Sequence, residues 1–349
     1  MMAYFIKVLF SYIYFILSYF YSCLYKFPVL KTKKFKKLQI VSVGNLTMGG
    51  AGKTPFIIFL SKLLSQHNIK HAVVSRGYKK TLSSNAYLLP GDSLSKFSPE
   101  AFGDEPFMLF NSLKNVPVFV GNKIKSLLRL QQILKRKTVL LDDGYQTHGL
   151  LKNINILLLD CSIDVSKYKL FPLGFLREPL SAIKRADVVV LTKTNLTTSK
   201  NLALLKQLFL PLIDSNKQLL LSTTFNSSLL AFKNNHLIVA SSINKNFQDS
   251  NVVSVCGIAN PASFQKTLKL LNIEVLKAFS FPDHYIYSSE NIQKVVSFCN
   301  EESVKNIITT KKDFYKIKKF IKSFNIFVVD VEHQIIEDYN FIKYLRDFK

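Results

Sequence analysis

The sequence predicts an α/β fold built on a mostly parallel β-sheet, and two features of the 349-residue chain lead to this prediction. Short apolar runs of strand length recur along the chain, and segments long enough for helices separate several of them. The first of these runs ends in a glycine-rich loop, and a helical pattern begins directly after that loop. A composition of 48% hydrophobic and 20% charged residues excludes wholesale disorder, and a typical domain size of about 150 residues indicates two domains.

The first set of predicted elements forms one domain over residues 38–220. Its expected strands are 38–43, 72–75, 116–120, 138–141, 154–159 and 186–191, and a helical pattern covers 56–64. This spacing is typical of βαβ units, whose strands are parallel. Ligands of such sheets bind outside the carboxyl ends of the strands, and we therefore expect functional residues there.

A second, smaller α/β domain is expected over residues 221–349. Its predicted strands are 252–256, 273–279, 306–309 and 325–329. Between the two sets, from about 195 to 251, the pattern weakens into sequence rich in Leu, Ser, Asn and Lys. We interpret this stretch as a hinge region.

The N-terminal segment, residues 1–37, has the composition of a membrane-associated helix followed by a basic cluster. Residues 8–25 run for 18 residues without a charge, near the lower limit for a helix that crosses a bilayer core of about 30 Å. An interfacial helix is also compatible with its tyrosines, and a buried core helix is the remaining alternative. Only Lys7 precedes the apolar run, whereas Lys26 and a cluster of five further lysines follow it, which places the bulk of the protein on the cytoplasmic side. These five are Lys31, Lys33, Lys34, Lys36 and Lys37.

The formal net charge of +24 indicates an anionic partner, since the chain has 47 Lys and Arg residues against 23 Asp and Glu residues. Nucleic acid, anionic lipid and polyphosphate all fit such a positive field. The chain lacks the aromatic-interleaved basic motifs of the common RNA-binding folds, which argues against nucleic acid. The four cysteines form no CxxC pair and no Cys–His cluster, so we expect a reducing compartment and neither disulfides nor structural zinc.

The loop after the first predicted strand carries a phosphate-loop motif. Residues 47–54 read TMGGAGKT and fit the pattern GxxxxGK[ST] except at the first place, where Thr47 stands instead of glycine. In such a loop, main-chain N–H groups and the N-terminus of the following helix bind phosphate oxygens. Lys53 would reach the β- and γ-phosphates, and the Thr54 hydroxyl would hold Mg²⁺. The expected nucleotide-binding residues of this P-loop NTPase-like core are Thr47, Met48, Gly49, Gly50, Ala51, Gly52, Lys53 and Thr54.

Two acidic pairs are candidate partners of the phosphate loop. Asp142 and Asp143 follow the predicted strand 138–141, and a carboxylate at a strand end usually positions the metal ion beside such a loop. A turn or a helix cap is the alternative role for this pair. Asp104 and Glu105 stand just before a helical stretch, where they could equally cap the helix.

Some further polar residues lie near the ends of predicted strands. His284 belongs to the sequence FPDH, and its imidazole can orient or accept a proton near neutral pH, although a structural role is the alternative. Thr192 and Lys193 follow a strand as in the base-reading loops of some nucleotide-binding proteins. Arg177 is also close to a strand end, without a specific role.

Taken in order, these motifs resemble those of one enzyme family. The segments VGNLTMGGAGKTP, VSRGYKK, GDEP, LDDGYQ, PLGFLREPL, GIANPASF, FPDH and TTKKD follow the order seen in the tetraacyldisaccharide 4′-kinases of lipid A biosynthesis, over residues 39–313. The resemblance implies a two-domain P-loop fold and ATP-dependent phosphorylation of the 4′-hydroxyl of a tetraacylated glucosamine disaccharide 1-phosphate, which gives lipid IVA. It also implies work at the cytoplasmic face of the bacterial inner membrane, and we expect a monomer that binds no nucleic acid.

Carried over residue by residue, the resemblance assigns roles to the acidic residues and to His284. Asp104 looks like the base that takes the proton of the sugar hydroxyl, with His284 as its partner across the cleft between the domains. Lys53 would neutralise charge during the phosphoryl transfer. The surround of the Mg²⁺ ion would be Thr54, Glu105, Asp142 and Asp143. Because Asp104 and His284 belong to different domains, activity would depend on domain closure.

The chain departs from the family pattern at two places. Thr147 stands where the family often has His, and His148 comes next, which makes a role for either residue uncertain. Ile124 stands where an Arg is common, and Lys123 or Lys125 could supply a point charge there, without the planar fork of Arg.

A membrane-associated nucleotide switch, a GTPase or an ATPase, is the alternative function, with Thr192 and Lys193 reading the base. Guanine recognition typically uses an aspartate two residues after that lysine, where this chain has Asn195, and this counts against the switch.

Overall fold

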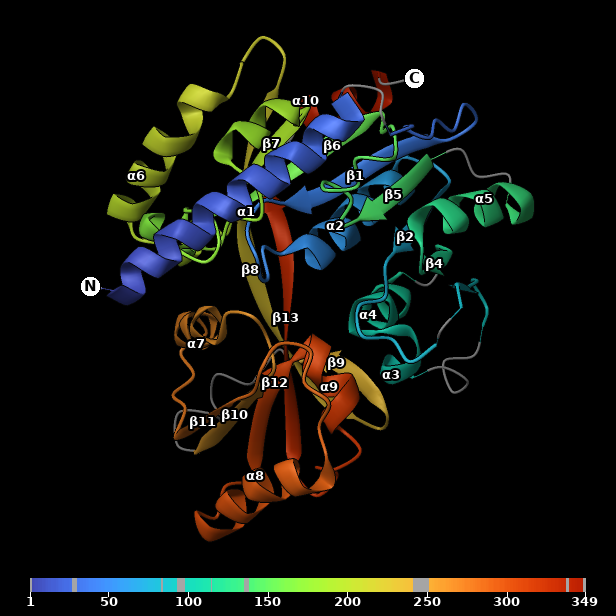
Figure 1. Cartoon of the computed structure of the whole chain (residues 1–349). Helices are drawn as coiled ribbons and strands as arrows, with labels where there is room; N and C mark the ends of the chain where they lie inside the picture. The colour runs from blue at the N-terminus through green and yellow to red at the C-terminus, as the bar shows by residue number, and fades with distance from the viewer. Residues whose placement is uncertain are drawn as a thin grey trace.

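In the computed structural model, the described residues are 2–26, 30–82, 84–92, 98–113, 115–134, 138–240, 251–336 and 339–347. They form two lobes that share one continuous sheet of thirteen strands (Figure 1). Two long strands join the lobes, β8 (Leu219–Lys233) and β13 (Asn325–Ile335), which pair with each other in antiparallel register. The predicted α/β fold with a mostly parallel sheet is confirmed.

The first lobe has the strand order β8-β7-β6-β1-β5-β2-β4-β3. Its strands are β1 (Gln39–Asn45), β2 (His71–Ser75), β3 (Ala86–Leu88), β4 (Val118–Val120), β5 (Thr138–Asp142), β6 (Ile154–Asp160) and β7 (Val188–Thr192). All pairs are parallel except β3 with β4. The central strands are buried along nearly their whole length, which explains why they are near-continuous apolar runs in the sequence.

Helices cover both faces of this half of the sheet. On one face, Val41 and Val43 of β1 pack in a core with residues of α2 (Lys53–Gln66), α4 (Asp104–Ser112) and α10 (Tyr339–Asp347). On the other face, separate cores include residues of α5 (Lys123–Ile133) and α6 (Ser199–Phe209). A short helix, α3 (Pro99–Phe102), precedes α4. This doubly wound arrangement leaves the carboxyl ends of the parallel strands open for ligands.

The second lobe continues the sheet in the order β13-β12-β10-β11. These three strands, β10 (Val252–Cys256), β11 (Lys277–Ser280) and β12 (Asn306–Thr310), are parallel to their neighbours, and β12 is also parallel to β13. The lobe's helices are α7 (Pro261–Leu270), α8 (Ser289–Glu301) and α9 (Lys311–Ile317), and β9 (His236–Val239) forms a hairpin with β8.

The predicted hinge region differs most from the structure. Residues 195–251 contain helix α6, the whole 15-residue strand β8, and β9, while 241–250 lie outside the described residues. The strand predicted over 273–279 begins only at Lys277. Helix α10 follows the second lobe in sequence but packs in the core of the first, through Phe341 and Leu345. The division into 1–37, 38–220 and 221–349 therefore stays a proposal.

The N-terminal helix α1 (Met2–Lys26) runs across the first lobe (Figure 1). Its residues Tyr4–Tyr25 are apolar enough and long enough to cross a membrane, by length and composition, and only 6% of its most apolar window is buried. The alternative of a buried core helix is therefore wrong. Two hydrogen bonds and one ring contact hold one side of α1 to the lobe. Ser11 Oγ donates to the Leu170 carbonyl at 2.9 Å, and Tyr14 OH donates to the Arg177 carbonyl at 2.9 Å. The Tyr25 ring stacks on His148.

Candidate active site

A cavity of about 530 Å³ lies between the lobes, at the carboxyl ends of the first-lobe strands. From the first lobe it is lined by the loop 48–54, by Asp142 and Asp143, and by Glu105. From the second lobe, Ile258, Asn260 and His284 are among the lining residues. The structure thus gathers around one cavity most of the residues that the sequence singled out in two separate domains.

The glycine-rich loop, residues 47–54, connects β1 to the N-terminus of α2. Gly49 and Gly52 have φ values of 100° and 84°, which glycine adopts without strain. The loop's start is fixed by the main-chain hydrogen bond from Met48 N–H to the Phe175 carbonyl at 2.6 Å. Since α2 is a 14-residue helix, its free N–H groups and dipole provide an anion-binding site at Lys53 and Thr54.

Lys53 and Arg177 share two acceptors at the base of the loop. Lys53 Nζ donates to Asn45 Oδ1 at 3.0 Å and lies 3.5 Å from Asp143 Oδ1. Arg177 Nη2 lies 3.2 Å from the same Asp143 oxygen and donates to the same Asn45 Oδ1 at 2.5 Å, and also to the main-chain carbonyl of Asn45 at 2.9 Å. Burial alone would raise the pKa of Asp143, but Lys53 and Arg177 outweigh it and hold this pKa far below its usual range. Asp143 is therefore an ionised anchor for both cations.

Asp142 has a different environment from its neighbour. Its side chain is buried, and Oδ2 accepts a hydrogen bond from Ser75 Oγ at 2.9 Å. Oδ1 has no hydrogen-bond partner in the part of the chain that the structure describes. Burial, together with the negative charges of Glu105 and Asp143, raises the pKa of Asp142 to about 7. A buried carboxylate oxygen without a partner, beside two further acids, fits a bound cation.

The described residues hold no group of three or more His, Cys, Asp and Glu side chains arranged to bind a metal by themselves. Mg²⁺ seldom needs one, because it usually keeps several waters and is held by one or two carboxylates and the substrate's phosphates. Asp142 and the Thr54 hydroxyl at the start of α2 fit this pattern, whereas Asp143 already pairs with Lys53 and Arg177.

Asp104 and His284 meet across the gap between the lobes. Asp104 is the first residue of α4, and its Oδ2 lies 3.2 Å from His284 Nδ1 and 2.9 Å from Lys316 Nζ. Burial raises the pKa of Asp104, but the His284 hydrogen bond and the Lys316 ammonium outweigh it, so that this pKa lies below its usual value. The Tyr78 ring packs edge-on against the imidazole, with centroids 5.0 Å apart. The carboxylate is therefore ionised and fixed in direction.

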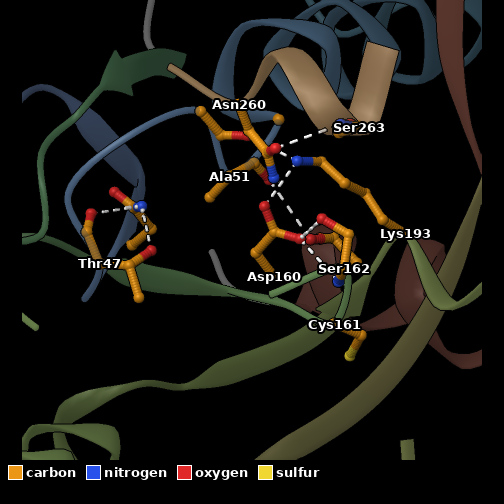
Figure 2. A network of polar contacts seen from close by, with 12 residues as sticks. Thr47, Ala51, Asp160, Cys161, Ser162, Lys193, Asn260 and Ser263 are labelled. Atoms are coloured by element: carbon orange, nitrogen blue, oxygen red, sulfur yellow. Dashed lines mark hydrogen bonds and ion pairs between the residues drawn. The ribbon is translucent and has the colours of Figure 1, made fainter. Parts of the chain in front are cut away.

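The side chain of Lys193 lies beside the glycine-rich loop and Asp160 (Figure 2). Its Nζ lies 2.5 Å from Asp160 Oδ2 and donates to the Gly50 carbonyl at 2.6 Å, and both side chains are almost fully buried. Asp160 Oδ1 accepts two hydrogen bonds from Ser162. Asn195, which stands where a guanine-reading aspartate would be, is bonded to the main chain of Phe225 in both directions. Residues 192–195 thus form hydrogen bonds with both the glycine-rich loop and β8.

The two departures from the family pattern take different places in the structure. Lys123 donates to the main-chain carbonyl of Asp143 and, at 3.2 Å, to Thr147 Oγ1, whereas Lys125 is exposed. Ile124 packs at the edge of an apolar core. His148 stacks on Tyr25 of α1, and its Nε2 lies 4.0 Å from Glu178 Oε2.

Sequence reasoning missed Asn45, which binds Lys53 and Arg177, and gave Arg177 no role. Asn45 is the last residue of β1, directly before the phosphate-loop motif, and this position is a signal that could have identified it.

The chain is similar to known proteins along most of its length. Residues 3–348 match the family model described as tetraacyldisaccharide-1-P 4′-kinase. A tetraacyldisaccharide 4′-kinase from Halothermothrix orenii is 32% identical over 308 residues, which cover 84% of this chain and 79% of the relative. A second, from Aquifex aeolicus, is 32% identical over 332 residues, which cover 93% and 94% of the two chains. The crystal structure of the "apo" form of LpxK from Aquifex aeolicus in complex with ATP is similar over 98% of both chains, with a TM-score of 0.73 and 30% identity.

Proposed function

The chain belongs to the tetraacyldisaccharide-1-P 4′-kinase family, and from this premise we propose how its residues carry out the reaction of an ATP-dependent kinase of lipid A biosynthesis. The enzyme transfers the γ-phosphoryl group of ATP to the 4′-hydroxyl of a tetraacylated glucosamine disaccharide 1-phosphate, and the product is lipid IVA. One observation carries the residue assignments: the glycine-rich loop, the acids at the end of β5 and His284 line the same cavity between the lobes, and His284 is bonded to Asp104.

The glycine-rich loop and Lys53 bind the phosphates of ATP. The N–H groups at the start of α2 and the helix dipole favour negative charge at this position. Lys53 Nζ lies between Asn45 Oδ1 at 3.0 Å and Asp143 Oδ1 at 3.5 Å, and its long side chain can turn from there to the β- and γ-phosphates. Arg177 remains to hold Asp143 when it does so.

Thr54, Asp142 and Glu105 are the residues that would hold a Mg²⁺ ion. When bound, the ion neutralises charge that develops on the phosphate oxygens. Asp143, by contrast, keeps Lys53 and Arg177 oriented. It would therefore act on the metal ion through its negative charge and not as a ligand.

Asp104 accepts the proton of the sugar hydroxyl, and His284 and Lys316 hold it in place. Both partners contact Oδ2, which leaves Oδ1 as the atom that faces the hydroxyl. The low pKa of Asp104 keeps it ionised, and a loose phosphoryl-transfer transition state needs positioning of the hydroxyl more than a strong base. Because His284 and Lys316 come from the second lobe, this orientation depends on the two lobes being together.

The N-terminal helix brings the enzyme to the cytoplasmic face of the inner membrane. The contacts of Ser11, Tyr14 and Tyr25 fix one side of α1 on the first lobe, and apolar side chains are exposed along the rest of it. A helix held in this way lies along the membrane interface with its apolar side in the lipid. The five exposed lysines of 31–37 add about 1 kcal/mol each near anionic lipid, and the protein works as a monomer.

The experiment is an assay with γ-labelled ATP and the tetraacylated disaccharide 1-phosphate in mixed micelles. Label on the lipid supports the proposal, whereas label only in free phosphate would indicate a nucleotide switch. The switch has no support in the family comparison, and the amide of Asn195 is already bonded to β8.

A further inference from the structure

Strand β13 reaches the glycine-rich loop through the buried side chain of His333. The strand begins in the second lobe at Asn325 and ends in the first lobe at Ile335 (Figure 1). His333 is 4% exposed, and its Nε2 lies 3.0 Å from the carbonyl oxygen of Gly52. Its Nδ1 lies 2.9 Å from the hydroxyl of Thr223 on the partner strand β8.

The chemistry of these partners fixes the protonation of the ring. A carbonyl oxygen only accepts hydrogen bonds, so Nε2 carries the proton and donates it to Gly52. The Thr223 hydroxyl can then donate to the unprotonated Nδ1. Burial and the nearby Lys193 ammonium together lower the pKa of His333 to about 3, although the hydrogen bond to Gly52 opposes them, so the ring is neutral at working pH. His333 is therefore a fixed donor directed at the loop.

Gly52 is the residue at which the loop becomes a helix. Its carbonyl also accepts the Phe56 N–H at 3.0 Å, so both lone pairs of this oxygen are used. A Cβ atom at Gly52 would lie 2.8 Å from the Phe225 ring and 2.9 Å from His333 Nε2. The two strands that join the lobes, β8 and β13, thus hold the peptide that precedes Lys53.

We propose that His333 is a positioning residue for the phosphates of ATP, because its Nε2–H fixes the Gly52 carbonyl and with it the direction of the next N–H groups and of Lys53. The inference rests on the proposed binding of ATP at this loop. It goes further because it assigns part of the nucleotide site to β8 and β13, the two strands that join the lobes. The same two strands then contact the glycine-rich loop and connect it to the second lobe.

A purely structural role for His333 would have other consequences. Its ring packs edge-on against Phe225 and Phe56, with centroids 4.5 Å and 5.2 Å apart, and this packing could by itself justify an aromatic residue. His333→Phe keeps an aromatic ring and removes the donor. His333→Gln restores a donor at about the place of Nε2 without the ring.

His71 is the matched control, since it is also buried in the first lobe and also bonded to α2. Its Nε2 lies 2.6 Å from Ser61 Oγ, on the same helix but beyond the loop. His71→Phe therefore reports the general cost of losing a buried histidine that is bonded to α2.

The experiment measures ADP dissociation constants by calorimetry, and KM for ATP and kcat in the lipid kinase assay, on folded samples of wild type and the three variants. Loss of one hydrogen bond predicts ADP binding about 3- to 10-fold weaker in His333→Phe, with a matching rise in KM for ATP. We expect near wild-type values in His71→Phe, and recovery of at least half of the lost affinity in His333→Gln.

Equal nucleotide affinities in His333→Phe and His71→Phe would overturn the proposal, as would a His333→Gln variant no better than His333→Phe. Those results would leave the kinase assignment intact, provided that wild type binds ADP and phosphorylates the lipid. Failure of wild type to bind ADP would instead refute the nucleotide site, and this inference with it.

Discussion

Oδ2 of Asp104 lies 3.2 Å from Nδ1 of His284, although 180 positions separate the two residues in the chain. Each stands at a special place in the backbone: Asp104 begins α4 after Gly103 with φ 93°, and His284 itself has φ 57°. Lys316 closes the group from α9. The pair therefore forms only when both lobes are folded and in contact with each other.

Replacement of Asp104 with Asn removes the proposed base and keeps the size of the side chain. General-base catalysis typically contributes about 10²- to 10⁴-fold, so we expect kcat for the lipid to fall within that range, with a small change in KM for ATP. Glu100→Gln is the control, because Glu100 also joins the lobes, with its Oε1 3.8 Å from Lys319 Nζ, but at a half-buried position away from the cavity. An Asp104→Asn enzyme with kcat within threefold of wild type would rule out a base at this position.

Replacement of Lys123 with Met tests whether this lysine takes over from the missing family arginine. Lys123 supports the main chain at Asp143, and burial lowers its pKa although Asp143 and Asp142 oppose this. We expect KM for ATP or lipid to rise about 3- to 10-fold, as for loss of one hydrogen bond to a charged group. Lys125→Met, at the exposed neighbouring position, should be unchanged, and steady-state kinetics that do not distinguish the two variants would contradict the assignment.

The fold was predictable where burial is complete. Strands such as β5 and β7 are apolar at almost every position because helices cover both faces of the sheet, and such runs are visible in sequence. Strand β8 was not predictable, since it is only partly buried along its 15 residues and its polar positions resemble a linker. Nor does any local pattern show that α10 packs in the core of the first lobe.

The candidate site was predictable where residues follow strands or belong to a motif. The loop 47–54, Asp142 and Asp143 all stand directly after predicted strands. His333 has no such signal, and Arg177 has the signal without a specific role, because the roles of both come from contacts with Gly52 and Asn45, which lie 281 and 132 positions away. Only the folded chain brings these residues together.

Removal of Lys193 alone from the buried Lys193–Asp160 pair should lower the free energy of unfolding more than removal of both charges. The two side chains are 4% and 2% exposed, so Lys193→Met leaves a buried carboxylate without its partner, at a cost of about 3 kcal/mol or more in unfolding free energy. The double variant Lys193→Met/Asp160→Asn removes that charge, and we expect it to be more stable than Lys193→Met alone. Urea unfolding measures this, and strictly additive losses would show that the two residues are not coupled.

Deletion of residues 1–26 should separate membrane attachment from catalysis. The deletion removes the apolar surface of α1, and we expect loss of binding to anionic vesicles and a larger loss of activity on vesicles than on detergent-dispersed substrate. Tyr14→Phe, which removes only the hydrogen bond to the Arg177 carbonyl, is the control for an effect through the site. Equal losses in the two assays would mean that α1 is needed for the fold alone.

The protonation of His333 gives a pH test that needs no substrate. The folded protein keeps this ring neutral because burial lowers its pKa to about 3, whereas in the unfolded chain the ring takes up a proton below its ordinary value of about 6.5. The unfolded state therefore binds one more proton over this range, and stability falls as the pH falls.

Between pH 7.5 and pH 5, wild type should lose about 2 kcal/mol more unfolding free energy than His333→Gln, which has no such proton. His148 also has a lowered pKa from burial, but it is present in both proteins and cancels in the difference. Denaturant unfolding at a series of pH values measures the two slopes. Parallel curves would show that the folded protein takes up this proton as readily as the unfolded chain, and that the ring is not held neutral as the donor to Gly52.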